Sequence, residues 1–281
     1  MKEMNEQMSW DRLINDKRFG LEDFHDARRG SRSDFQRDFD RLVFSSPFRR
    51  LQNKTQVFPL PGSVFVHNRL THSMEVASVG RSLANEISSA LSAKYADEPW
   101  RGKLDALDEI VGAACLAHDL GNPPFGHSGE KAISTFFSEG AGAVLQKDMT
   151  EAQWADFTHF EGNANSFRLL THQFKGRRQG GFAMTYSMLA SIVKYPYESR
   201  LAGKKNKFGF FSSETDTFKR IADELGLLPR YGAGGEICYA RHPLVYIVEA
   251  ADDICYQVMD IEDAHKLRVL LTDEVIGLFM S

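Results

Sequence analysis

Apolar residues recur every three or four positions in three long stretches of the chain, which is the spacing of one face of a helix. The three apolar stripes comprise Val76, Val79, Leu83, Ile87 and Leu91; Leu107, Ile110, Val111 and Ala114; and Val245, Val248, Cys255 and Met259. The alternation typical of a half-buried strand is scarce, and its candidates are residues 64–66 and 237–239. The pattern therefore predicts an all-α fold with at most a small β-hairpin.

Two polar residues stand on these stripes at positions that face the predicted interior. His118 is the next position on the second stripe, and Asp252 lies within the third. A buried carboxylate is costly unless it is paired, protonated or bound to a cation. Both residues are therefore candidates for chemistry as well as for packing.

Segments rich in proline, glycine or lysine separate the periodic stretches. Residues 59–62 divide an arginine-rich N-terminal segment from the first long helix. Residues 121–126 end the helix that carries His118, because proline cannot continue it. The basic stretch 200–207 and the glycine-rich stretch 226–235 are expected to be exposed loops.

We divide the chain into a charged, helical N-terminal arm at residues 1–45 and a larger domain at residues 46–281. Acids are interspersed among the arginines of the arm, so a solvated, salt-bridged surface is expected for most of them. The basic residues just after the arm, at positions 49–50 and at Lys54, are exceptions to this expectation, because they run directly into the first motif. A new helical pattern begins at Thr272, which favours a domain that is truncated, or naturally short, at its C-terminal end.

The composition leaves the predicted fold unchanged and excludes several classes of protein. The chain has 281 residues, 42% of them hydrophobic and 26% charged, which is ordinary for a soluble globular protein. Its net charge of −4 provides no overall attraction to nucleic acid, so any such contact would be local. Three cysteines without CxxC spacing argue against a disulfide framework and a thiolate zinc site, and they favour a cytoplasmic setting. The sequence contains no apolar run of about 18 residues, so no membrane span is expected.

The adjacent pair His118-Asp119 places two potential metal ligands on consecutive residues. His72 upstream and Asp252 downstream complete the order H…HD…D of a metal-dependent phosphohydrolase. Two imidazoles and two carboxylates suit a divalent ion with open positions for water and substrate. Arg69, three residues before His72, adds a planar cation for phosphate oxygens on the same helical face. Any one of these residues alone is more often structural, so the prediction depends on the set.

His127 and Glu130 are one helical turn apart, just after the proline-rich segment. A histidine held by a nearby acid is typical of proton transfer in phosphate chemistry. The alternative is that Glu130 only stabilises the first turn of its helix, where the helix dipole favours an acid.

Polar residues continue the third stripe beyond Asp252. Tyr256 and Asp260 follow at steps of four, so they share a helical face with Asp252. Tyr256 is a candidate to hydrogen-bond a phosphate there, and Asp260 a sugar hydroxyl. Glu262 and Asp263 are expected to form a solvated, acidic helix face.

Five segments closely resemble the deoxyguanosinetriphosphate triphosphohydrolase branch of the HD-domain superfamily. They are SPFRRLQNKTQV (46–57), RLTHSMEV (69–76), HDLGNPPFGHSGE (118–130), FEGNANSFR (160–168) and EAADDICY (249–256). The third segment is specific to this branch, whereas H…HD…D is shared by many HD phosphohydrolases. The resemblance extends from about Arg32 to the last residue, and it implies the helical HD-domain fold.

The resemblance implies an enzyme that converts a dNTP and water into a deoxynucleoside and tripolyphosphate. His127, oriented by Glu130, would act as acid or base near the α-phosphate. One divalent metal ion is implied, with Mn or Mg favoured by a phosphate substrate and Fe, Ni or Zn as alternatives. Its ligands would be His72, His118, Asp119 and Asp252.

The residues that the resemblance places against the substrate are Gln56, Arg69, Lys194, Tyr195, Tyr256 and Asp260. Arg69, Lys194 and Tyr256 would hold the triphosphate. Gln56 and Asp260 would bind the 3′-hydroxyl of the deoxyribose. A tyrosine packed under the sugar would exclude a 2′-hydroxyl, and both Tyr195 and Tyr256 are candidates for this position.

The resemblance also implies dGTP as the first substrate to test, a homo-oligomer, and single-stranded DNA as a candidate effector. The chain departs from the family at Asn165, where glutamine is frequent, and in its shorter C-terminal part. Two alternatives stay open: another HD nucleotidase or phosphodiesterase, and a non-catalytic homologue that binds nucleotides or single-stranded DNA through the N-terminal arginines.

Overall fold

The computed structural model describes residues 7–23, 31–59, 66–176, 179–203, 206–231 and 237–280. Its α-helices are α1 (Trp10–Leu13), α2 (Asp34–Val43), α3 (Ser46–Arg50), α4 (Arg69–Lys94), α5 (Leu107–Ala117), α6 (Gly126–Ser138), α7 (Glu151–Thr158), α8 (Gly162–Thr171), α9 (Tyr186–Ser191), α10 (Thr215–Leu225), α11 (Leu244–Lys266) and α12 (Thr272–Met280). Its 3-10 turns are η1 (Leu51–Asn53), η2 (Arg101–Ala106), η3 (Ala141–Asp148), η4 (Ser199–Leu201) and η6 (Ser212–Glu214). Helices dominate the described residues, which confirms the all-α prediction.

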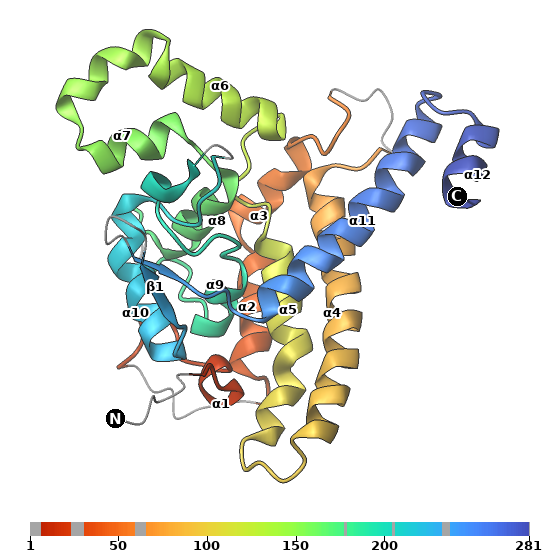
Figure 1. Cartoon of the computed structure of the whole chain (residues 1–281). Coiled ribbons are helices and arrows are strands. Elements are labelled where there is room, and N and C mark those ends of the chain that lie inside the picture. The colour runs from red at the N-terminus through yellow and green to blue at the C-terminus, as the bar shows by residue number, and fades with distance from the viewer. Residues whose placement is uncertain are drawn as a thin grey trace.

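The three apolar stripes correspond to α4, α5 and α11, which pack against one another (Figure 1). Every residue of α5 is buried except Asp108 and Glu109 in its first turn. Small residues bring the helices close together, because a Cβ atom on Gly80 of α4 would lie 2.6 Å from the sulfur of Cys115 on α5. This close packing brings polar residues of all three helices near the C-terminal end of α5.

The remaining helices extend the same core. α2 and α9 both pack against α5, and α10 packs against α9. Phe35 and Leu42 of α2 belong to the same buried cluster as Leu107 and Ile110 of α5. The N-terminal segment therefore contributes side chains to the main core, and a domain boundary at residue 45 stays a prediction.

Helices α6 and α7, joined by η3, project from one end of the molecule (Figure 1). Aromatic contacts hold the two helices together: the ring of Phe137 lies 4.5 Å from that of Phe157 and 6.5 Å from that of Trp154, measured between centroids. Because α6 begins at Gly126, His127 occupies its first turn.

The strands β1 (Pro229–Tyr231) and β2 (Ile237–Tyr239) form an antiparallel hairpin. The hairpin confirms the predicted strand at 237–239. The prediction of a loop throughout 226–235 was wrong for 229–231, where the backbone pairs with β2. In the other predicted strand, residues 64 and 65 lie outside the described residues, and Val66 is in a bend.

Among the described residues, none of the helices combines the length and the apolar character that crossing a membrane requires.

Candidate active site

A cleft of about 600 Å³ opens where α4, α5, α6 and α11 approach one another. Its lining includes all of the residues that the sequence predicts for the site, namely Gln56, Arg69, His72, His118, Asp119, His127, Glu130, Lys194, Tyr195, Asp252, Tyr256 and Asp260. The volume is within the range of small-molecule sites in proteins. The chain thus brings together residues up to about 200 positions apart.

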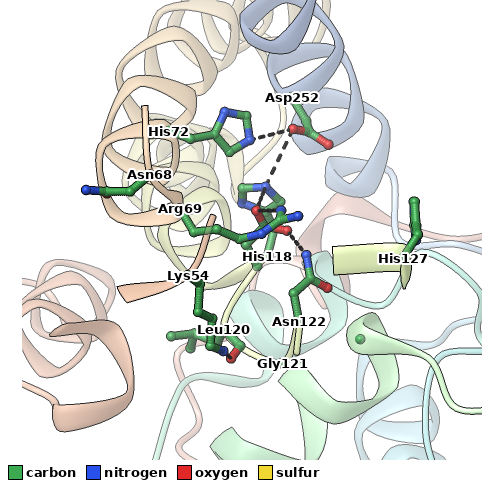
Figure 2. Close-up of polar contacts among 12 residues, drawn as sticks. Lys54, Asn68, Arg69, His72, His118, Leu120, Gly121, Asn122, His127 and Asp252 are labelled. Carbon is green, nitrogen blue, oxygen red and sulfur yellow. Dashed lines mark hydrogen bonds and ion pairs between the residues drawn. The ribbon is translucent and has the colours of Figure 1, made fainter. Parts of the chain in front are cut away.

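The predicted metal ligands converge at one point of this cleft (Figure 2). Ligand atoms of His72, His118 and Asp119 lie within 4.8 Å of one another. An oxygen of Asp252 lies 3.0 Å from Nε2 of His72 and 3.5 Å from Nε2 of His118. Nitrogens and oxygens at these distances either share protons or share a cation.

The hydrogen bonding of His118 fits a metal ligand. Its Nδ1 donates to the carbonyl oxygen of Cys115 at 2.6 Å, which fixes the proton on Nδ1 in the neutral ring and leaves the lone pair on Nε2. That Nε2 is buried and accepts no hydrogen bond within the described part of the chain. A buried nitrogen of this kind needs a partner, and a divalent cation would be one.

The electrostatics of the cluster also fit a cation. Burial by itself lowers the pKa of His118, but the carboxylates of Asp119 and Asp252 outweigh burial and raise it to about 9. In turn, the nearby histidines hold the pKa values of Asp119 and Asp252 below their usual range, against the opposing effect of burial. The site therefore favours positive charge among its carboxylates, which a divalent metal ion supplies.

Arg69 connects the group of predicted metal ligands to the rest of the cleft. Its guanidinium forms an ion pair with Asp119, whose other carboxylate oxygen accepts a hydrogen bond from the side-chain amide of Asn122. A Cβ atom on Gly126 would lie 2.8 Å from Nη2 of Arg69, and Gly126 has a φ of +52°. Glycine at this position therefore gives the arginine room to reach Asp119.

His127 and Glu130 form a hydrogen-bonded pair at the start of α6. Nδ1 of His127 lies 2.7 Å from Oε2 of Glu130, and Oε1 of Glu130 accepts from the backbone N–H of Gly162 at 2.8 Å. His127 is exposed to the cleft, whereas Glu130 is buried. The hydrogen bond to Glu130 raises the pKa of His127. Glu130 thus makes its side-chain hydrogen bonds to His127 and to α8, which favours the orienting role over simple stabilisation of the first turn.

Glycine at 162 is what permits this junction between α6 and α8. A Cβ atom there would lie 2.0 Å from Oδ1 of Asn122 and 2.9 Å from Oε1 of Glu130. The first turn of α8 therefore docks directly on the carboxylate that holds His127.

Sequence reasoning missed Lys207, which lines the cleft. Its ammonium lies 2.8 Å from Glu161 and 4.0 Å from Glu130. Lys207 does lie in a loop, but the prediction that this loop is exposed was wrong for it, and residues 204 and 205 of the same stretch lie outside the described residues. The apolar residues that follow it are buried and pull the lysine inward. A lysine next to a buried aromatic run was the signal that could have identified it.

Several other missed residues line the same cleft, namely Val57, Asn122, Glu161, Asn163, Ser191, Ile192, Val245, Val248 and Glu249. Among them, Glu249 pairs with Lys194 at 2.8 Å and with Arg241 at 2.9 Å. Arg69, Lys194 and Lys207 thus place three partly or largely buried cations around the cleft. Such an arrangement suits a polyanionic ligand.

The predicted sugar-binding residues lie on two sides of the cleft. Oε1 of Gln56 is buried and has no hydrogen-bond partner within the described residues. Tyr256 and Asp260 line the cleft from α11, and burial raises the pKa of the Asp260 carboxyl. Tyr195 lies under the guanidinium of Arg241, 5.6 Å from the ring centroid.

The prediction of a solvated acidic face at 262–263 was wrong for Asp263. This residue is buried and accepts hydrogen bonds from the backbone N–H and Nδ1 of His67. Glu262 is exposed and pairs with Lys266. Asp263 therefore ties the end of α11 to the segment that precedes α4.

Residues 69–195 match the HD domain family model. The chain is 44% identical, over 98% of its length, to a deoxyguanosinetriphosphate triphosphohydrolase-like protein of Pseudomonas aeruginosa (strain LESB58), and it covers 61% of that protein. It is 41% identical over 94% of its length to a protein of the same description from Synechocystis sp. (strain ATCC 27184 / PCC 6803 / Kazusa), and again covers 61%. Identity to the deoxyguanosinetriphosphate triphosphohydrolase of Yersinia enterocolitica serotype O:8 / biotype 1B (strain NCTC 13174 / 8081) is 36%, over 86% of this chain and 52% of that protein.

Residues 69–195 of the chain therefore match an HD domain. Over most of its length the chain is similar to proteins of the deoxyguanosinetriphosphate triphosphohydrolase branch, as its motifs predict. The chain spans 61% of the length of the Pseudomonas and Synechocystis relatives.

Proposed function

We propose that this protein is a metal-dependent dNTP triphosphohydrolase, which converts a dNTP and water into a deoxynucleoside and tripolyphosphate. The observation that carries the proposal is the convergence of the metal-type cluster and the His127–Glu130 pair on one cleft. The names of the relatives support dGTP as the first substrate to test. Self-association and a single-stranded DNA effector stay predictions.

The residues that would hold the metal are His72, His118, Asp119 and Asp252. When bound, a divalent ion lowers the pKa of water and polarises a phosphoryl oxygen. Mn or Mg is the first choice for a phosphate substrate, with Fe, Ni or Zn as alternatives. Asn122 and Arg69 orient the Asp119 carboxylate from both of its oxygens.

His127 acts as the general acid in this proposal. Water attacks the α-phosphorus and loses a proton to solvent, while His127 donates its proton to the 5′-oxygen of the deoxyribose as the bond between that oxygen and the α-phosphorus breaks. Glu130 holds the ring in position and favours its protonated form, since the hydrogen bond to the carboxylate raises the pKa of His127. The leaving deoxynucleoside then departs as a neutral alcohol.

The three cations of the cleft bind the triphosphate. Arg69, Lys194 and Lys207 come from α4, the segment after α9 and the segment before η6, so they surround the ligand from different directions. Gln56 and Asp260 bind the 3′-hydroxyl, and Oε1 of Gln56, which has no hydrogen-bond partner among the described residues, supports this role. Tyr195 and Tyr256 both line the cleft and stay the two candidates for excluding a 2′-hydroxyl.

Product analysis tests the proposed reaction directly. The purified protein is incubated with each dNTP and with GTP, in Mn²⁺, in Mg²⁺ and in EDTA, and the products are separated by ion-exchange chromatography. We expect tripolyphosphate and deoxynucleoside from dNTPs only in the presence of metal, and little turnover of GTP. Pyrophosphate or orthophosphate as the product would instead assign the chain to another HD reaction.

The pH dependence of the rate tests the general-acid role. A raised pKa keeps His127 protonated at a higher pH than an ordinary histidine, whose pKa is about 6.5. An acid must be protonated, so kcat should fall as the pH rises through the pKa of His127. Glu130→Gln removes the carboxylate that raises this pKa, and the falling limb of the pH–kcat profile should move to lower pH. An unchanged limb in this variant would contradict the assignment.

A further inference from the structure

Lys54 lies beside the cleft, two residues before Gln56, and its backbone is fixed to the start of α4. Its carbonyl oxygen accepts a hydrogen bond from the backbone N–H of Arg69 at 3.1 Å. The next residue, Thr55, forms an antiparallel bridge with Asn68. These bonds set the position of Gln56 relative to α4.

The side chain of Lys54 reaches the turn that follows α5, beside the cleft. Its ammonium donates to the carbonyl oxygen of Leu120 at 2.9 Å, in the turn that directly follows Asp119 (Figure 2). A cation is favourable here, because the carbonyl groups at the C-terminal end of α5 carry partial negative charge. Lys54 therefore joins the segment of Gln56 to the turn that carries a predicted metal ligand.

The surroundings of this ammonium are not those of an ordinary surface lysine. Burial lowers its pKa to about 8, with a further lowering by Arg50 and Arg69 and an opposing effect of Asp119. The lysine is thus kept next to other cations and partly out of water, which opposes its charge. A methionine side chain of similar length would avoid this penalty and still fill the space.

We propose that Lys54 is a positioning residue that holds Gln56 at a fixed distance from the Asp119 turn, and thereby sets specificity for the sugar 3′-hydroxyl. The backbone bonds hold Gln56 relative to α4 alone, whereas the ammonium spans the gap to the turn after α5. A site that selects its ligand by a hydrogen bond must hold its groups within about 0.5 Å of the positions at which that bond forms. This inference rests on the proposed binding of a deoxynucleotide in the cleft.

The test compares the binding of dGTP with that of 2′,3′-dideoxy-GTP, which lacks the 3′-hydroxyl. Dissociation constants are measured by calorimetry in EDTA, so that the readout needs no turnover. The wild type should bind dGTP roughly tenfold more tightly, as expected for a hydrogen bond to a site built for it. Lys54→Met should remove most of this preference, to the same extent as Gln56→Ala, and the double variant should lose no more. Lys54→Arg, which keeps the donor, should retain part of it.

Matched controls separate this effect from a general loss of structure. Lys147→Met makes the same change at an exposed lysine of η3 and should leave the preference and the melting temperature unchanged. The inference is overturned if Lys54→Met keeps the wild-type preference, or if the losses in the double variant add. Equal binding of the two nucleotides by the wild type also overturns it. Wild-type preference without hydrolysis of any dNTP would refute the proposed reaction and leave this inference standing.

Discussion

Replacing Asp119 with alanine is expected to abolish metal binding and turnover together. The substitution removes a buried carboxylate from the cluster with His72 and His118. It also leaves the guanidinium of Arg69 without its ion-pair partner. Loss of one member of a buried pair typically costs about 3–5 kcal/mol, so the melting temperature should fall as well.

Metal content and steady-state rates check this prediction. The wild type and Asp119→Ala are loaded with Mn²⁺, desalted and analysed by elemental mass spectrometry, and each is then assayed with dGTP. Asp105→Ala is the matched control, because Asp105 is exposed and lies outside the cleft. A variant that retains metal at the wild-type stoichiometry would show that Asp119 is not a ligand.

Replacing His127 with alanine is expected to leave metal binding intact while most of the rate is lost. His127 is exposed to the cleft and hydrogen-bonds to Glu130, while the metal-type residues lie on α4, at the two positions that follow α5, and on α11. Loss of a general acid typically lowers kcat by about 10²–10⁴. The KM for dGTP should change far less than kcat, since the substitution leaves the cations that are proposed to hold the triphosphate unchanged.

The matched control for this variant is His265→Ala, which removes an exposed histidine near the end of α11, outside the cleft. Metal content, kcat and KM are measured for both variants under identical loading. His127→Ala at wild-type speed would exclude the general-acid role, and loss of its metal would instead indicate that His127 supports the ion.

The parts of the fold and site that the sequence predicts are those that depend on local repetition and on motifs. The apolar stripes locate α4, α5 and α11, because a buried helical face must repeat every three or four residues. The metal-type residues and the His127–Glu130 pair were predicted from their spacing, and other site residues such as Gln56 and Lys194 from the resemblance. The fold brings all of the predicted site residues to one cleft. Their individual roles stay proposals.

Lys207 and Asp263 were misplaced for a shared physical reason. Each stands in a local run of like charge, which looks the same in sequence whether it faces water or a distant partner. The partner of Lys207 is Glu161, 46 positions away, and the partner of Asp263 is His67, 196 positions away. Sequence periodicity carries no information about such long-range ion pairs, whereas the packing of the elements decides them.

The separation of His72 and Asp252, 180 positions apart in the chain yet 3.0 Å apart in space, has a consequence for folding. An ion shared by these residues would cross-link α4 to α11 and close most of the chain into a loop. A ligand that binds only the folded state stabilises it by mass action, by about 2.7 kcal/mol at a hundred times its dissociation constant. On a ribosome, the complete set of ligands would exist only after α11 had emerged. The cation would therefore bind late in synthesis, after the other helices had formed their contacts.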